Sequence, residues 1–230
     1  MSSHAPGTRV QRMPRAQRRA QLLEAALTVF VQRGYHAAAM EDIADEAGVS
    51  KPVLYQHFPG KLELYLALLD VQCDTLEGLV LEALGSSEDH EERVYATVAA
   101  FFSFVADQGG AFRLIYESDL TNEPQVRHRL DALEAQLGEA IAQRITEDTP
   151  LPQELAEMLG LAMAGAAQVM ARTWLAHGSQ FPKEVAQQAA GHLAWRGMGS
   201  FPVNRMGDPD KAVDTPSDTM GTVNPLTPKE

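Results

Sequence analysis

Apolar residues recur at separations of three and four along most of the chain between residues 14 and 199. This spacing places them on one face of an α-helix, and the alternation typical of a strand does not stand out anywhere. Glycine and proline separate the periodic segments, because glycine often ends a helix and proline fits its first turn. The pattern predicts an all-α fold of about nine helices. The expected helices cover residues 14–34, 40–47, 50–58, 61–84, 88–106, 112–120, 122–146, 154–177 and 182–198.

The second and third of these segments form a pair around Gly48. Two short helices joined by a tight glycine-containing turn are typical of a helix-turn-helix. Ser50 is predicted to cap the later helix by accepting a hydrogen bond from a first-turn N–H, and Pro52 fits that turn. Leu54 and Phe58 can anchor this helix inward, which leaves small or polar side chains free to enter a DNA major groove. A helix pair that only packs is the alternative. The side chains expected at DNA are Ser50, Lys51, Val53, Tyr55, Gln56 and His57.

Charge is distributed unevenly along the chain. The formal net charge is −12, yet residues 1–61 carry eight Lys/Arg and five Asp/Glu. The N-terminal end is therefore the part suited to phosphate. Residues 1–13 are expected to be a disordered basic arm, either contacting DNA or only aiding solubility. Residues 200–230 contain five prolines and are expected to be a disordered tail. The arm and the start of the first helix supply Arg9, Arg12, Arg15, Arg18 and Arg19.

The sequence offers poor support for an enzyme. It contains no Gly-rich phosphate loop, no G-x-S-x-G elbow, no paired cysteines and no H-E-x-x-H. His90 precedes two glutamates, but a solvated helix face explains this run better than a metal site. We therefore expect no catalytic residues, no metal and no cofactor. The lone Cys73 fits a reducing cytoplasm. Residues 158–171, the longest charge-free stretch, are too few for a membrane span of about 20 residues.

Two apolar groups in the second half of the chain can face each other. They can form a filled core or enclose an apolar cavity, and the residues alone favour the filled core because aromatic residues at helical spacing usually pack. The first group comprises Phe101, Phe102, Phe104, Phe112 and Tyr116. The second comprises Leu155, Met158, Leu159, Leu161, Met163, Val169, Met170 and Trp174.

Small residues are concentrated between Gly160 and Ala176, and small residues let helices approach closely. Together with residues 185–195, this segment can pack within one chain or form the face on which two copies pair. Reading an operator with two recognition helices requires two-fold pairing.

The chain resembles the TetR family of bacterial transcription regulators over residues 22–69. The likeness runs from Leu-Leu-Glu-Ala-Ala through Ile-Ala-Asp-Glu-Ala-Gly-Val-Ser and Leu-Tyr-Gln-His-Phe to Lys-Leu-Glu-Leu. The resemblance implies a homodimer that binds a double-stranded DNA operator and holds a ligand between the helices of its regulatory domain. It also implies that Arg18, Arg19 and Lys61 lie at phosphates. Met40 stands where the family often has threonine, which puts the usual phosphate contact there in doubt. Gln56 is expected to read a base, because a Gln amide can pair with adenine.

A second likeness concerns the FasR group of actinobacterial regulators, which control fatty-acid synthesis genes and sense long-chain acyl-CoA. Its most selective piece begins at Phe112, with the sequence Phe-Arg-Leu-Ile-Tyr-Glu-Ser-Asp-Leu-Thr-Asn-Glu-Pro. The resemblance implies a long-chain acyl-CoA effector. The residues expected at its acyl chain are Leu76, Val80, Leu84, Phe101, Phe104, Val105 and Phe112. Arg93 and Arg113 are the nearest basic candidates for its head.

These observations predict a helix-turn-helix DNA-binding domain at residues 14–60 and a ligand-binding and dimerisation domain at residues 61–199. The expected protein is a cytoplasmic regulator of fatty-acid biosynthesis genes. Three alternatives stay open. They are a TetR-type repressor of efflux or catabolic genes that senses another hydrophobic molecule, a small helical enzyme acting on acyl-CoA, and a DNA-bending protein without an effector.

Overall fold

The computed structural model describes residues 13–107, 109–116, 120, 122–177 and 180–198. These residues form nine α-helices and no strand, which confirms the predicted all-α fold. The arm predicted at residues 1–13 lies almost wholly outside the described residues, and the predicted tail lies wholly outside them. The helices are α1 Arg15–Ala37, α2 Met40–Glu46, α3 Lys51–His57, α4 Lys61–Leu84, α5 His90–Asp107, α6 Gly109–Tyr116, α7 Pro124–Asp148, α8 Gln153–Ala176 and α9 Lys183–Met198.

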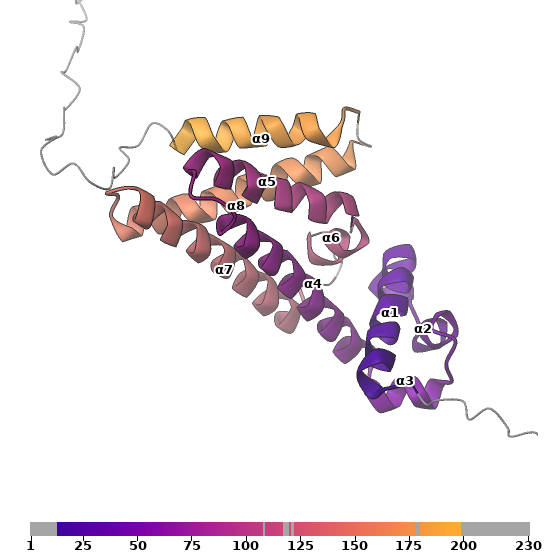
Figure 1. Cartoon of the computed structure of the whole chain (residues 1–230). Coiled ribbons are helices and arrows are strands. Elements are labelled where there is room, and N and C mark those ends of the chain that lie inside the picture. Colours follow the sequence, from indigo (N-terminus) through magenta and orange to yellow (C-terminus); the bar gives the residue numbers. More distant parts are fainter. Residues whose placement is uncertain (1–12, 108, 117–119, 121, 178–179, 199–230) are drawn as a thin grey trace, which may run out of the picture.

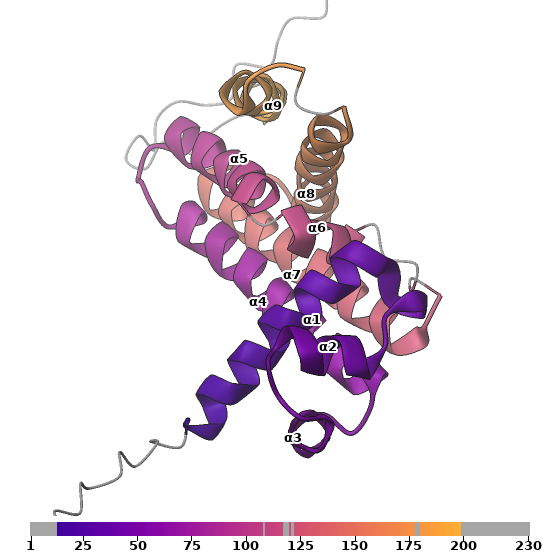
Figure 2. The same cartoon turned by 90° about the vertical axis from the view of Figure 1, so that its right-hand side faces the viewer.

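The helices are arranged as a small N-terminal group and a larger bundle (Figure 1). Helices α1, α2 and α3 lie together at one end, and α4 runs from them into the bundle formed with α5, α7, α8 and α9. Helix α6 packs against α1, α4 and α5, so it lies between the two groups (Figure 2). A displacement of α4 or α6 can therefore reach the N-terminal helices by direct contact.

Two glycine positions differ from the predicted helix boundaries. Gly34 has φ 74°, a left-handed conformation that glycine adopts without strain. The chain kinks there, and helical structure continues to Ala37 rather than ending at Gly34. Gly110 was predicted to lie in a break but belongs to α6. An added Cβ on Gly110 would lie 3.0 Å from a methyl carbon of Val31, so its missing side chain lets α6 approach α1.

Part of the small-residue segment packs inside the chain. An added Cβ on Gly160 would lie 2.3 Å from the carbonyl oxygen of Gly138, and one on Gly138 would lie 2.6 Å from the Leu161 side chain. These two glycines let α7 and α8 approach closely where they meet. Within the described ranges, no helix combines the length and apolar character needed to cross a bilayer.

Candidate DNA-binding surface and effector cavity

Helix α3 is anchored by two apolar side chains and presents the others outward. Leu54 and Phe58 are buried at 0% and 2% exposure, as their four-residue spacing predicts. Ser50 occupies the N-cap position, but its hydroxyl makes no capping bond, so that prediction was wrong. Its backbone carbonyl instead accepts bonds from the next turn, which leaves the exposed hydroxyl available to a partner. The exposed side chains of α3 include Lys51, Tyr55 and Gln56, while Val53 and His57 are half-buried.

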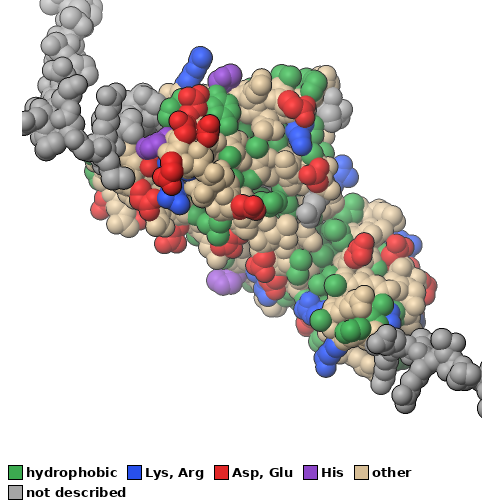
Figure 3. Space-filling model, in the orientation of Figure 1, with side chains coloured by type: hydrophobic (Ala, Val, Ile, Leu, Met, Phe, Trp, Pro, Cys, Tyr) green, Lys and Arg blue, Asp and Glu red, His purple; other side chains and the backbone are tan. Residues whose placement is uncertain are grey.

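The beginning of α1 lies beside the end of α3. The Arg19 guanidinium sits over the ring of Phe58, 4.8 Å from its centroid. Burial lowers the pKa of His57, and the nearby charges of Arg15, Arg18 and Arg19 lower it further. The imidazole therefore lies near the arginines at the beginning of α1, and several Lys or Arg side chains are seen at this end of the molecule, among hydrophobic and acidic ones (Figure 3).

Side-chain contacts hold α1 against the turn between α2 and α3. Arg18 donates a hydrogen bond of 2.6 Å to the Gln21 side chain, and Gln21 donates one of 2.8 Å to the carbonyl of Ala47. These bonds hold the turn between α2 and α3 in place relative to the arginines of α1. The predicted basic residues of α1 and the polar residues of α3 are thus parts of one surface.

Two acids of α2 engage neighbouring basic residues. Glu41 pairs with Lys51 at the start of α3, and Asp42 lies 2.7 Å from Arg33 of α1. Asp42 also accepts a 3.0 Å hydrogen bond from the backbone of the residue before α2, so it caps that helix. Met40 is nearly buried at 9% exposure. A buried methionine is placed to pack the module rather than to meet phosphate.

Lys61, expected at a DNA phosphate, has its ammonium group engaged within the chain. Its Nζ donates to the backbone carbonyls of Tyr35, His36 and Ala38 at distances of 2.8, 3.3 and 2.9 Å. It also lies 4.4 Å from the centroid of the Tyr35 ring. Carbonyls left free at the end of a helix attract a cation. Lys61 therefore ties the first residue of α4 to the end of α1.

A buried aromatic group continues this link into the bundle. Tyr65 lies 5.3 Å from both Phe30 and Tyr35, measured between ring centroids. Its hydroxyl donates a buried 3.2 Å hydrogen bond to the Leu114 carbonyl in α6. Helices α1, α4 and α6 thus meet around Tyr65, which joins the DNA-binding helices to the rest of the chain.

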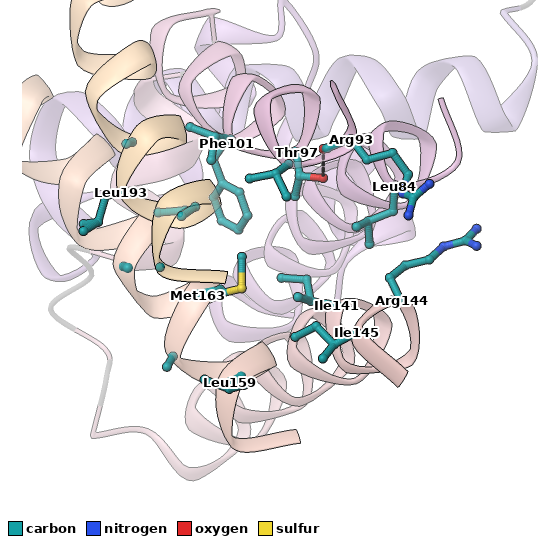
Figure 4. A pocket seen from close by; sticks show the side chains of 18 of the residues that line it. Leu84, Arg93, Thr97, Phe101, Ile141, Arg144, Ile145, Leu159, Met163 and Leu193 are labelled. Atoms are coloured by element: carbon teal, nitrogen blue, oxygen red, sulfur yellow. Dashed lines mark hydrogen bonds between the residues drawn. The ribbon is translucent and has the colours of Figure 1, made fainter. Parts of the chain in front are cut away.

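A cavity of about 280 Å³ lies between α5, α7, α8 and α9, next to the end of α4. Phe101 and Met163 point toward one another across it, and Ile141 and Ile145 project into it from α7 (Figure 4). Its volume is close to the lower end of small-molecule sites, roughly 300–1,000 Å³. Its apolar walls suit an alkyl or other hydrophobic guest. Further wall residues are Leu84, Val94, Val98, Leu159, Ala162, Ala166, Ala167, Met170, Ala190, Leu193, Ala194 and Gly197.

Polar groups are concentrated at one end of the cavity. Arg93 is 7% exposed, pairs with Asp148, and donates a 3.0 Å hydrogen bond to the Ser87 carbonyl. His90 Nδ1 lies 3.3 Å from the same Asp148 carboxylate. Arg144 also lines this end, is half-exposed and pairs with Glu147 at 2.7 Å. His90 and Arg93 therefore share one aspartate, and the half-exposed Arg144 is the basic side chain at this end that a negatively charged ligand group can reach.

The comparisons with known proteins place the chain in a family. The family of bacterial regulatory proteins named tetR matches residues 22–68. The HTH-type transcriptional activator FasR of Mycolicibacterium smegmatis is 42% identical over 197 residues, which are 86% of this chain and 90% of that protein. This chain belongs to the TetR family. It is a DNA-binding transcription regulator similar to FasR, and the relative is named as a regulator rather than an enzyme.

Solved TetR-like structures agree in fold. A TetR-like regulator from Rhodococcus sp. RHA1 has a TM-score of 0.63 at 29% identity, covering 82% of this chain and 100% of that one. FadR from Bacillus subtilis, solved in complex with stearoyl-CoA, has a TM-score of 0.62 at 18% identity, covering 76% of this chain and 96% of that one. The second likeness shows the shared TetR fold alone.

Only two of the seven predicted effector residues line the cavity of this TetR-family protein. They are Leu84 and Phe101. The other five are buried in the core and do not line the cavity. The predicted head-group residue Arg93 lies at the polar end, whereas Arg113 is exposed on α6 and does not line the cavity. These five core residues are Leu76, Val80, Phe104, Val105 and Phe112.

The missed cavity residues come from helices far along the chain. Leu159, Met163 and Met170 belong to the second apolar set, so periodicity had marked them as interior without showing what they face. Ile141 and Ile145 of α7 carried the same helical signal and were not selected. Packing between helices that are distant in sequence decides which interior residues border the cavity. The spacing of apolar residues along one helix does not predict this packing.

Proposed function

We propose that this TetR-family regulator acts as a homodimer on operators of fatty-acid biosynthesis genes, and that a long-chain acyl-CoA modulates its DNA binding. The observation that carries the effector proposal is the apolar cavity with arginines at one end. An acyl chain fits the apolar wall, and Arg93 and Arg144 suit the negatively charged head. The similarity to FasR supports the gene class, and the stearoyl-CoA bound to FadR supports the ligand class.

In the proposed DNA complex, α3 enters the major groove. Gln56 is exposed on α3 and free to read a base edge, while Ser50, Lys51 and Tyr55 are exposed beside it. Arg18, Arg19 and His57 lie on the adjoining basic surface and meet phosphates. Residues 14–60 form the DNA-binding domain, and residues 61–199 form the effector and dimerisation domain.

The cavity and the DNA-binding helices share α4. Leu84 at one end of α4 lines the cavity, and Lys61 at the other end holds the end of α1. A ligand that displaces the cavity end of α4 therefore shifts the three N-terminal helices. This changes the separation of the two recognition helices in the dimer and weakens operator binding.

Mapping of bound DNA across the genome tests the proposed gene class. Crosslinking and sequencing should recover palindromic sites upstream of fatty-acid synthase genes, and Gln56→Ala should reduce their occupancy. Sites concentrated at efflux or catabolic genes instead would reject the fatty-acid role and favour a repressor that senses another hydrophobic molecule. In that case the cavity would hold a different hydrophobic guest. A cationic drug would fit it poorly, because the carboxylate of Asp148 already pairs with Arg93.

A further inference from the structure

Helices α8 and α9 expose large apolar side chains that nothing in the described chain covers. Leu193 of α9 is 62% exposed, although leucine is usually buried. An exposed apolar patch of this kind marks an interaction surface. The other large exposed side chains of this α8–α9 face are Met158, Leu161, Val169 and Val185.

The exposed residues of α8 are arranged symmetrically about Gly165. Leu161 and Val169 lie four positions before and after it. The exposed charges Glu157 and Arg172 lie farther out, at nearly equal sequence distances from Gly165. A two-fold axis near Gly165 would place Leu161 against Val169 of a second copy and Glu157 near Arg172 of that copy. An added Cβ on Gly165 would meet no atom within 4 Å, so its bare surface is free for close approach. A second copy of this chain thus matches the face in its apolar residues and in charge.

The same face forms one wall of the cavity. Ala162 and Ala166 of α8 and Leu193 of α9 line the cavity, and all three are exposed. In Figure 4, Leu193 lies on the opposite side of the cavity from Arg93 and Arg144. The end remote from the arginines, where the tip of an alkyl chain would lie, is therefore bounded by residues of the exposed α8–α9 face.

We propose that a second copy of the chain completes the effector cavity by covering the gap between α8 and α9. The inference rests on the proposed effector function and adds that the ligand site is incomplete in one copy. The partner's α8 then shields the end of the alkyl chain from water. Ligand binding and dimer formation consequently strengthen each other, by the same factor for each of the two sites, as linkage requires.

Gly165→Leu tests the inference, with Gly78→Leu as its matched control. Both glycines lie in long helices, and an added Cβ meets no atom within 4 Å at either site, so the monomer should fold in both variants. Circular dichroism and thermal unfolding verify this. In sedimentation, Gly165→Leu should be monomeric and Gly78→Leu dimeric. Palmitoyl-CoA should bind monomeric Gly165→Leu about tenfold more weakly than dimeric Gly78→Leu. The gain from lauroyl- to stearoyl-CoA should also be smaller for the monomer, because the chain tip stays in water.

A monomeric Gly165→Leu that binds palmitoyl-CoA as tightly as Gly78→Leu would overturn the inference and leave the effector proposal intact. A dimeric Gly165→Leu would overturn it by placing the interface elsewhere. Failure of the wild-type chain to bind any of the acyl-CoAs would remove the proposed effector and the inference together. Dilution of the wild-type protein gives a second test without a mutation. Saturating palmitoyl-CoA should lower the dimer dissociation constant about a hundredfold, because each of the two sites of the dimer contributes about tenfold, and an unchanged constant would contradict the linkage.

Discussion

Replacing Lys61 by methionine tests whether this residue stabilises the fold or contacts a DNA phosphate. The methionine keeps a similar apolar stem but removes the ammonium that donates to the carbonyls of Tyr35, His36 and Ala38. Hydrogen bonds to charged groups are worth about 1.5–3 kcal/mol each when shielded, and these three share one half-exposed cation. We therefore expect a total loss of about 2–3 kcal/mol in the free energy of unfolding, including the Tyr35 ring contact.

Urea denaturation measures this loss, and thermal unfolding should show a midpoint lower by roughly 5–10 °C. Operator binding over a range of salt concentrations supplies the second measurement. Because the ammonium is engaged within the chain, the slope of log affinity against log salt should be the same in Lys61→Met and wild type. An unchanged stability together with a slope smaller by about one would show that Lys61 contacts a phosphate and would refute the reasoning.

Four further predictions concern DNA, ligand, pH and the lone thiol. Gln56→Ala should lower affinity by about 1–3 kcal/mol at one operator base pair, whereas equal losses on operator and random DNA would remove its base-reading role. Leu84→Phe should block palmitoyl-CoA binding in calorimetry, and Leu81→Phe, on the exposed face of the same helix, should leave it unchanged. The pKa of His57 is lowered in the free protein and should rise beside phosphate. Operator affinity should therefore be highest below the free pKa and fall as pH rises through the bound pKa, a dependence that His57→Gln should abolish. Burial raises the pKa of Cys73 to about 12, so a thiol reagent at pH of about 8 should react with it only after unfolding.

Helix positions followed from the sequence because apolar spacing, proline and glycine act locally. The pattern located α3 and its anchors Leu54 and Phe58, as burial confirms. The helix boundaries predicted at Gly34 and Gly110 were wrong for a different reason. Gly34 adopts a positive φ within continuing helical structure, and Gly110 permits contact with Val31, which is remote in sequence.

The site was harder to predict because its geometry depends on long-range packing. Residues of α4 and α5 were expected to hold the effector since both helices are apolar, yet Leu76 and Val80 are fully buried away from the void. The charge of Lys61 suggested phosphate, and the structure shows that its ammonium also donates to carbonyls at the end of α1. A side chain's residue type indicated what it can bind, and only the fold indicated which partner it meets.

Release of operator DNA by acyl-CoA tests the account most directly. A fluorescent operator bound to the wild-type protein would be titrated with lauroyl-, myristoyl-, palmitoyl- and stearoyl-CoA while anisotropy is recorded. Each added methylene that is buried should lower the half-release concentration roughly fourfold, until the chain reaches the end of the cavity. Complete retention of operator with every acyl-CoA, by protein that remains folded, would contradict the proposed effector.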